Sequence, residues 1–173
     1  HLTQENDEYL GWGATLGPLQ QGFHVGSEHR GSHSYGYSAE EKNTFADLKP
    51  GTFPVDSLTE LAIDFLEEHQ DEPFMLYYST YYVHTPVKTR NKWLYDKYRD
   101  KLGTDADEAL INYAAFIETM DYHIGQLLQT LEELRIDENT MVIFTSDNGG
   151  DPRFSESDLL RAGKWTLYEG GIR

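Results

Sequence analysis

The spacing of apolar positions divides the chain into an irregular first third, residues 1–54, and a regular remainder, residues 55–173. The first helical stretch of the remainder begins at Ser57, where the Ser57-x-x-Glu60 spacing is typical of a capping box. The apolar positions that follow share one helical face and are Leu58, Leu61, Ala62, Phe65 and Leu66. The pattern therefore predicts a helix that starts at Ser57 and buries this face.

A longer stretch with helical spacing covers about residues 107–134. Its predicted buried stripe consists of Leu110, Ala114, Ile117, Ile124, Leu128 and Leu131. Asp121 interrupts this stripe, so we expect its carboxyl group to be buried and hydrogen-bonded rather than bound to a metal ion.

Two short apolar runs, Phe74–Tyr78 and Met141–Thr145, have no alternation of polar and apolar residues, which is typical of strands covered on both faces. Each run follows one of the predicted helices. This order predicts an α/β fold with a mostly parallel sheet flanked by helices, in which both runs are interior strands.

Residues 1–54 are rich in Gly, Ser, His and aromatic residues and show no regular period. They predict an ordered but irregular loop region, because the aromatic side chains need burial while glycine permits unusual backbone angles. A packing role and a ligand-binding role remain equally open for this region.

Composition excludes several classes of protein. The 173 residues carry 14 Lys and Arg against 30 Asp and Glu, so a net charge of −16 makes nucleic acid an unsuitable partner. No apolar run approaches the roughly 20 residues that a membrane helix needs, and the first residues are polar and acidic, so neither a transmembrane helix nor a signal peptide is predicted. The chain has no cysteine, which excludes disulfides, thiolate metal sites and a cysteine nucleophile within it.

Chemically versatile side chains follow the two predicted strands, where open parallel sheets bind ligands. Asp147 and Asn148 precede two glycines and offer adjacent oxygen donors that suit Ca²⁺ or Mg²⁺, although an ordinary turn is the simpler interpretation. His84 could donate to an anion or transfer a proton, and Lys164 could pair with a compact anion. Taken separately, a structural histidine and a solvated lysine are the more common cases.

In chain order, these segments resemble the type I, formylglycine-dependent sulfatases of the alkaline phosphatase superfamily. The resemblance is carried by the strand Phe74–Tyr78 with Val83-His84-Thr85-Pro86, by the helix that includes Tyr113–Gly125, by Val142–Gly150, and by the signature Gly163-Lys164-Trp165-Thr166-Leu167-Tyr168-Glu169-Gly170-Gly171-Ile172-Arg173. Gln20-Gln21-Gly22-Phe23 is similar to a further family segment, with His24 where Asp is usual, and His1-Leu2 resembles the end of another.

The resemblance implies a partial sulfatase fold in which residues 1–173 form part of one catalytic domain. It implies that Asp147 and Asn148 bind Ca²⁺, with Mg²⁺ as the alternative, that Lys164 and His84 hold the sulfate group, and that His1 lies beside the nucleophile. We therefore expect Asp147, Asn148, His84 and Lys164 to converge at one edge of the sheet. The implied substrate is a small sulfate ester, either an aryl sulfate or a sulfated saccharide, and the implied location is periplasmic, secreted or lysosomal.

The chain also departs from the family pattern. The formylglycine nucleophile is made from Cys or Ser in a Cys/Ser-x-Pro-x-Arg motif, and this sequence contains neither cysteine nor that motif. We therefore expect an interior fragment of a longer sulfatase that, alone, binds Ca²⁺ feebly, has little or no turnover and requires the missing remainder as a partner. The alternatives are a phosphate ester hydrolase of the same superfamily, disfavoured because Asn148 stands where a zinc-binding histidine is expected, and a non-catalytic anion- or metal-binding fragment.

Overall fold

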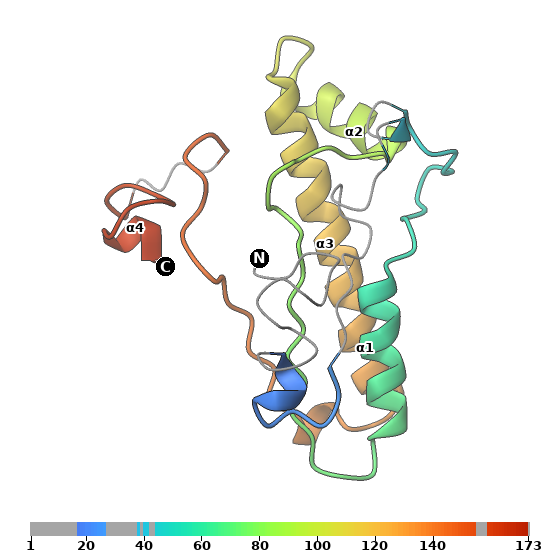
Figure 1. Ribbon diagram of the computed structural model, residues 1–173. Helices are drawn as coiled ribbons and strands as arrows, with labels where there is room; N and C mark the ends of the chain where they lie inside the picture. Colours follow the sequence, from blue (N-terminus) through green and yellow to red (C-terminus); the bar gives the residue numbers. More distant parts are fainter. Residues whose placement is uncertain (1–16, 27–37, 39, 42–43, 155–158, 173) are drawn as a thin grey trace. The chain divides into compact units, whose positions relative to one another are not determined.

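The computed structural model describes residues 17–26, 38, 40–41, 44–154 and 159–172 (Figure 1). The helices in these residues are η2 (Pro18–Gln20), α1 (Ser57–Glu68), α2 (Lys92–Leu102), α3 (Glu108–Glu133), η5 (Asp137–Asn139) and α4 (Glu169–Ile172). The chain divides into two compact units, His1–Arg30 and Gly31–Arg173, and all the helices except η2 belong to the second. Within the described part of the chain, no helix has the length and apolarity needed to cross a bilayer.

Helix α1 occupies the predicted residues, but its N-cap lies one residue earlier than expected. Asp56 has extended backbone angles, and its side chain accepts a hydrogen bond from the Thr59 backbone N–H at 3.0 Å. The capping box predicted at Ser57 is therefore wrong in register: Asp56 satisfies a free N–H of the first turn, which is the usual function of an N-cap aspartate.

Helices α1 and α2 both pack against the long helix α3 (Figure 1). The buried apolar side chains come from all three helices and from the segment between α1 and α2, and they are Ala62, Leu66, Tyr82, Leu94, Ile111, Ala115, Phe116 and Leu131. Phe53 extends this packing, since it stacks on Tyr122 of α3 at 4.1 Å and meets Trp93 of α2 edge-on at 5.4 Å. The core of the second unit is thus built mainly from helix contacts.

Helix α3 begins and ends close to the predicted bounds, and Asp107 caps it through the Ala109 N–H at 2.8 Å. Its buried face, however, matches the predicted stripe only in part: Leu131 is buried, and Ala114 and Ile124 are half-buried. The buried residues include Ile111, Ala115, Phe116, Thr119 and His123, whereas Leu110, Ile117 and Leu128 of the predicted stripe are exposed. Asp121 is exposed as well, so the expectation that its carboxyl group is buried is wrong.

Helix α2 was not anticipated from the sequence. It has Asn91 as its N-cap residue and ends before Gly103, whose φ of 101° is a conformation that glycine adopts readily. Leu94 is its fully buried anchor, and Lys97 binds both carboxylate oxygens of Glu118 on α3, at 2.6 and 2.7 Å. The surroundings of Tyr98 between these helices raise the pKa of its hydroxyl to about 12, first through burial and then through its hydrogen bond with Glu118.

The two apolar runs are not assigned as strands; the β-pairing found in the described residues is an isolated parallel bridge between Ala46 and Asn91. Along Phe74–Thr80 the side chains alternate between half-buried and exposed, with Met75 and Tyr77 exposed. This period of two is typical of an extended segment that is covered on one side. Met141–Thr145 is exposed throughout, so the predicted sheet stays a prediction.

The segment that leads to His84 is fixed by buried polar contacts at both of its ends. Tyr82 donates its hydroxyl to Asp56 at 3.1 Å, and its ring meets Phe116 of α3 edge-on at 5.8 Å. Farther along, the Thr89 N–H donates to the Asn112 side chain of α3 at 2.9 Å. These contacts hold the intervening loop against α1 and α3.

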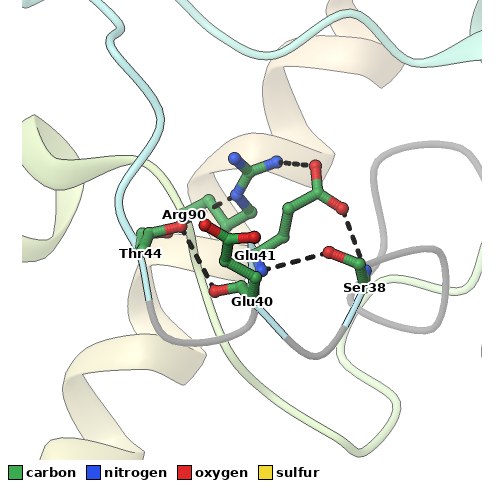
Figure 2. Close-up of polar contacts among 5 residues, drawn as sticks. All are labelled: Ser38, Glu40, Glu41, Thr44 and Arg90. Atoms are coloured by element: carbon green, nitrogen blue, oxygen red, sulfur yellow. Dashed lines mark hydrogen bonds and ion pairs between the residues drawn. The ribbon is translucent and has the colours of Figure 1, made fainter.

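A second polar cluster ties part of the irregular first third to the residues just before α2 (Figure 2). Ser38 and Glu41 exchange hydrogen bonds, with each backbone N–H donating to the other side chain, at 2.9 and 3.2 Å. Glu41 also accepts from Arg90 at 2.9 Å, and the Ala46 N–H donates to the Arg90 carbonyl at 2.8 Å. These contacts show a packing role for Ser38, Glu41 and Ala46, one of the two roles that the sequence left open.

The Asp56–Tyr82 hydrogen bond gives a prediction about stability. We expect Tyr82→Phe to lower the free energy of unfolding by about 1–2 kcal/mol, since it leaves a buried carboxyl oxygen with one partner fewer. Tyr77→Phe, at a position whose side chain is 74% exposed, is the matched control and should change it by less than about 0.5 kcal/mol. Urea denaturation measures both variants, and equal effects would contradict the importance of this hydrogen bond.

Candidate functional site

The structure describes four of the five side chains predicted to form the site. His1 lies outside the described residues, whereas His84, Asp147, Asn148 and Lys164 are all described. His84 belongs to the loop after Phe74–Thr80, and the other three belong to the last part of the chain.

His84 is half-buried in a turn that its own hydrogen bonds define. Its backbone N–H donates to the Tyr81 carbonyl at 3.1 Å, and its Nδ1 lies 2.5 Å from the Thr85 carbonyl oxygen. Because a carbonyl oxygen only accepts, Nδ1 is the protonated nitrogen in this contact, which fixes the orientation of the ring. The opposite nitrogen, Nε2, is therefore the atom through which His84 would act on a ligand.

Lys164 is held next to the turn that follows Asp147 and Asn148. Its backbone N–H donates to the Gly150 carbonyl at 2.9 Å, and the Gly149 N–H donates to the Gly171 carbonyl at 2.9 Å. These two hydrogen bonds join residues 14 and 22 positions apart along the sequence, so the two segments lie side by side. The lysine side chain is half-buried, with its Nζ 5.2 Å from the centre of the Trp165 ring.

The contact between these two segments depends on the absence of side chains at four glycines. A Cβ added to Gly149 would lie 1.8 Å from the Gly170 carbonyl oxygen, and one added to Gly170 would lie 2.0 Å from the Ala162 carbonyl oxygen. A Cβ added to Gly163 would lie 2.8 Å from the Gly150 carbonyl oxygen and 2.9 Å from a side-chain carbon of Pro152, and one added to Gly171 would lie 2.2 Å from the Thr166 carbonyl oxygen. We call Gly149, Gly163, Gly170 and Gly171 the glycine cluster; only glycine permits so close an approach of backbone to backbone.

Three of the four non-glycine residues with positive φ among the described residues lie near the two predicted sulfate contacts; the fourth is Arg135, just after α3. Positive φ angles occur at Val83, which precedes His84, and at Ala162 and Trp165, which flank Lys164, with values of 65°, 63° and 77°. Such angles are uncommon for residues with a Cβ, and Val and Trp adopt them at an energetic cost. Residues held in such conformations cluster at functional sites, so this observation supports both loops independently of motif resemblance.

Asp147 and Asn148 provide oxygen donors of the kind that Ca²⁺ and Mg²⁺ prefer, and Asp147 is exposed. The turn around them is closed by the Ser146 hydroxyl, which donates to the Asn148 carbonyl at 2.5 Å. Among the residues that the structure describes, no group of three or more His, Asp or Glu could hold a metal ion. These two residues therefore suit a hard cation in chemical type but supply only part of the six to eight ligands that Ca²⁺ takes.

A charged pair lies immediately beyond the glycines of the turn. Arg153 donates from Nε and Nη2 to the carboxylate of Asp151, at 3.0 and 2.5 Å. This hydrogen bonding, with a smaller contribution from the charge of Lys164, lowers the pKa of Asp151 to about 2. The next residue, Phe154, stacks on Tyr113 of α3 at 5.0 Å, and burial together with the negative Asp151 raises the pKa of Tyr113. The Asp151 carboxylate near Lys164 is thus already paired with Arg153.

Two features of this region were not predicted from the sequence: the glycine cluster and the exposed Trp165, which is 83% accessible. The sequence indicates each of them in part. The paired glycines Gly149-Gly150 and Gly170-Gly171 point to the glycine cluster, and the aromatic residue next to Lys164 is Trp165 itself. The contacts of His84 given above lie within its own loop, so its convergence with Lys164 stays a prediction.

Comparison with known proteins supports the motif resemblance. The family model described as Sulfatase matches residues 8–173. The chain is 36% identical to a sulfatase of Formosa agariphila over 68% of its own length, and 33% identical to an N-acetylgalactosamine-6-O-sulfatase of Bacteroides thetaiotaomicron over 68%. It is 36% identical to human arylsulfatase A over 61% of its length.

One solved structure, Ps i-CgsB in complex with k-i-k-neocarrahexaose, superposes with a TM-score of 0.58 at 28% identity and covers 68% of this chain and 26% of the other. This likeness is consistent with a sulfatase fold. The chain spans 20–24% of the length of the three curated relatives named above.

The glycine cluster gives a second prediction. Gly149→Ala should destabilise the protein by about 1–3 kcal/mol, because its Cβ forces the two segments apart. Gly125→Ala, in α3 where an added Cβ meets no described atom within 4 Å, should instead stabilise it by about 0.5–1 kcal/mol. Urea unfolding of both variants tests this, and a neutral Gly149→Ala would show that the segments are not held as described.

The Asp151 carboxylate gives a prediction about pH. Since its pKa in the folded state, about 2, is below the usual value, its pairing stabilises the fold above about pH 4 and this contribution disappears as the pH falls toward 2. Asp151→Asn should therefore lower the thermal midpoint at pH 6 and reduce its dependence on pH between 4 and 2. Identical acid profiles for the variant and the parent protein would contradict this role.

Proposed function

Because this chain belongs to the sulfatase family, we propose that it carries the sulfate-binding part of the active site of a sulfuric ester hydrolase. In this proposal Lys164 and His84 bind the sulfate group, Asp147 and Asn148 ligate a divalent cation, and His1 lies beside the nucleophile. Ca²⁺ is the first choice for that cation and Mg²⁺ the second.

The observation that carries the proposal is the hydrogen bond from the Lys164 backbone to Gly150, which places the lysine beside the Asp147-Asn148 turn. A carboxylate with an adjacent amide suits a cation, while a lysine suits an anion. A cation-binding pair of side chains next to a lysine is chemically reasonable when a metal ion and a negatively charged group bind together. The strained backbone on each side of Lys164 and before His84 is consistent with the same site.

The chemistry follows from the charge that develops when a sulfate ester is cleaved. As the S–O bond breaks, negative charge grows on the oxygens, and donors fixed in advance stabilise this charge without having to reorganise. The Lys164 ammonium is such a donor. The Nε2 of His84, oriented by the contact of Nδ1 with Thr85, donates as well when the ring is in its imidazolium form. A cation bound at Asp147 and Asn148 would supply further positive charge to the same oxygens. The family resemblance implies that the attacking group is a formylglycine, which this cysteine-free chain does not contain.

The substrate class we propose is a sulfated saccharide. The relatives include a protein named for N-acetylgalactosamine 6-sulfate hydrolysis and a structure solved with an oligosaccharide, although arylsulfatases are among them as well. A chain with a net charge of −16 repels polyanions in general, so the local cation and lysine must provide the attraction for the sulfate group.

The test is a sulfate-release assay on the full-length protein with Ca²⁺, using N-acetylgalactosamine 6-sulfate, k-i-k-neocarrahexaose and an aryl sulfate. Lys164→Ala should lower kcat/KM by roughly 10²–10³-fold, the usual effect of removing one charge-stabilising donor. Lys101→Ala, which removes an exposed lysine in the last turn of α2, is the matched control and should leave kcat/KM unchanged.

Activity that survives in Lys164→Ala would contradict the assignment of this lysine. Faster hydrolysis of a phosphate ester than of every sulfate ester tested would instead favour the alternative, a phosphate ester hydrolase of the same superfamily.

A further inference from the structure

Trp165 presents a large aromatic surface next to the proposed sulfate site. Its side chain is 83% exposed, which is unusual for tryptophan, a residue that is highly buried on average. The Lys164 Nζ lies over one face of its ring, 5.2 Å from the centre, so a stacked ligand would use the opposite face. The ring and the ammonium group are therefore close enough to contact one small ligand at the same time.

The backbone sets the direction in which the Trp165 side chain leaves the chain. Trp165 has a φ of 77°, which a bulky residue rarely adopts. The residues on either side are fixed, because the Lys164 N–H donates to Gly150 at 2.9 Å and the Thr166 hydroxyl donates to the Gly163 carbonyl at 2.8 Å. Residues held in sparsely populated backbone conformations cluster at active sites and ligand clamps, so the φ of Trp165 supports a role in ligand binding.

The ammonium group of Lys164 and the neighbouring indole ring together favour a ligand that has both a sulfate group and a sugar ring. A group bound through its sulfate to the lysine would place the ring that carries the sulfate within reach of the indole face. The faces of a sugar ring present C–H groups of slightly positive character, which suit the negative face of an aromatic ring. Apolar contact of this kind adds affinity without demanding a particular pattern of hydroxyl groups.

We propose that Trp165 is a specificity-determining residue that stacks on the sugar ring of a sulfated saccharide held at Lys164. This inference rests on the proposed function, since it takes Lys164 as the sulfate contact. It adds to that function the residue that favours a saccharide over inorganic sulfate.

The experiment measures binding by calorimetry on the full-length protein, with inorganic sulfate and with each sulfated saccharide named above, so that it does not depend on turnover. Trp165→Ala should weaken saccharide binding by roughly 3- to 10-fold, as expected for the loss of one aromatic contact, and leave sulfate binding unchanged. Trp165→Phe should retain most of the affinity. Leu167→Ala, which removes an apolar side chain that is 94% exposed in the same loop, is the control and should match the parent protein.

Trp165→Gly separates the ring from the backbone, because glycine adopts a φ of 77° without strain. The proposal predicts that the Gly and Ala variants lose the same affinity for saccharide. A Gly variant that binds as the parent does, or an equal loss of sulfate and saccharide binding in Trp165→Ala, would overturn it. So would a parent protein that binds none of the saccharides more tightly than sulfate.

The two proposals fail in different ways. Saccharide binding that depends on the ring without any hydrolysis would contradict the proposed function alone. Hydrolysis with no effect of the ring on KM or binding would contradict the role of Trp165 alone.

Discussion

The buried carboxyl group of Asp56 is the interaction on which the arrangement around His84 depends. It is 3% exposed, caps α1 through Thr59 and accepts the hydroxyl of Tyr82 at 3.1 Å. A buried carboxyl group is tolerated only when its oxygens are hydrogen-bonded, so the start of α1 and the segment before His84 each require the other. Tyr82 in turn packs on Phe116, which extends this dependence to α3. One side chain thereby links two helices to the loop that carries a candidate sulfate contact.

Helix bounds could be predicted from the sequence better than helix faces. The stretch of residues 107–134 matches α3 closely, because Asp107 is a strong cap and the apolar spacing is long. The spacing also contains a second apolar face, and periodicity alone cannot say which face meets α1 and α2. In the described residues those helices cover Ile111 and Ala115 and leave Leu110 exposed. Helix α2 was missed because its single fully buried anchor, Leu94, gives little periodic signal among charged and aromatic neighbours.

For the candidate site, short motifs identified the loops, and the structure added how those loops are held. The sequence pointed to His84 and Lys164 by resemblance, but spacing could not reveal that Gly149 and Gly170 touch backbone to backbone. Nor could it reveal the positive φ at Val83 and Trp165, since neither residue type favours that angle. The approach of Gly149 to Gly170 joins segments that are separate along the chain, and no local propensity contains such a contact.

The alternation of half-buried and exposed side chains along Phe74–Thr80, together with the exposure of Met141–Thr145, has a consequence for handling the protein. Ile143 and Phe144 are 76% and 73% exposed, in a segment that has no charged side chain and that pairs with no strand among the described residues. Short, uncharged, apolar segments of this kind template intermolecular β-pairing when nothing covers them. These residues expressed on their own would therefore tend to aggregate as their concentration rises, and solubility rather than helix stability would limit the yield.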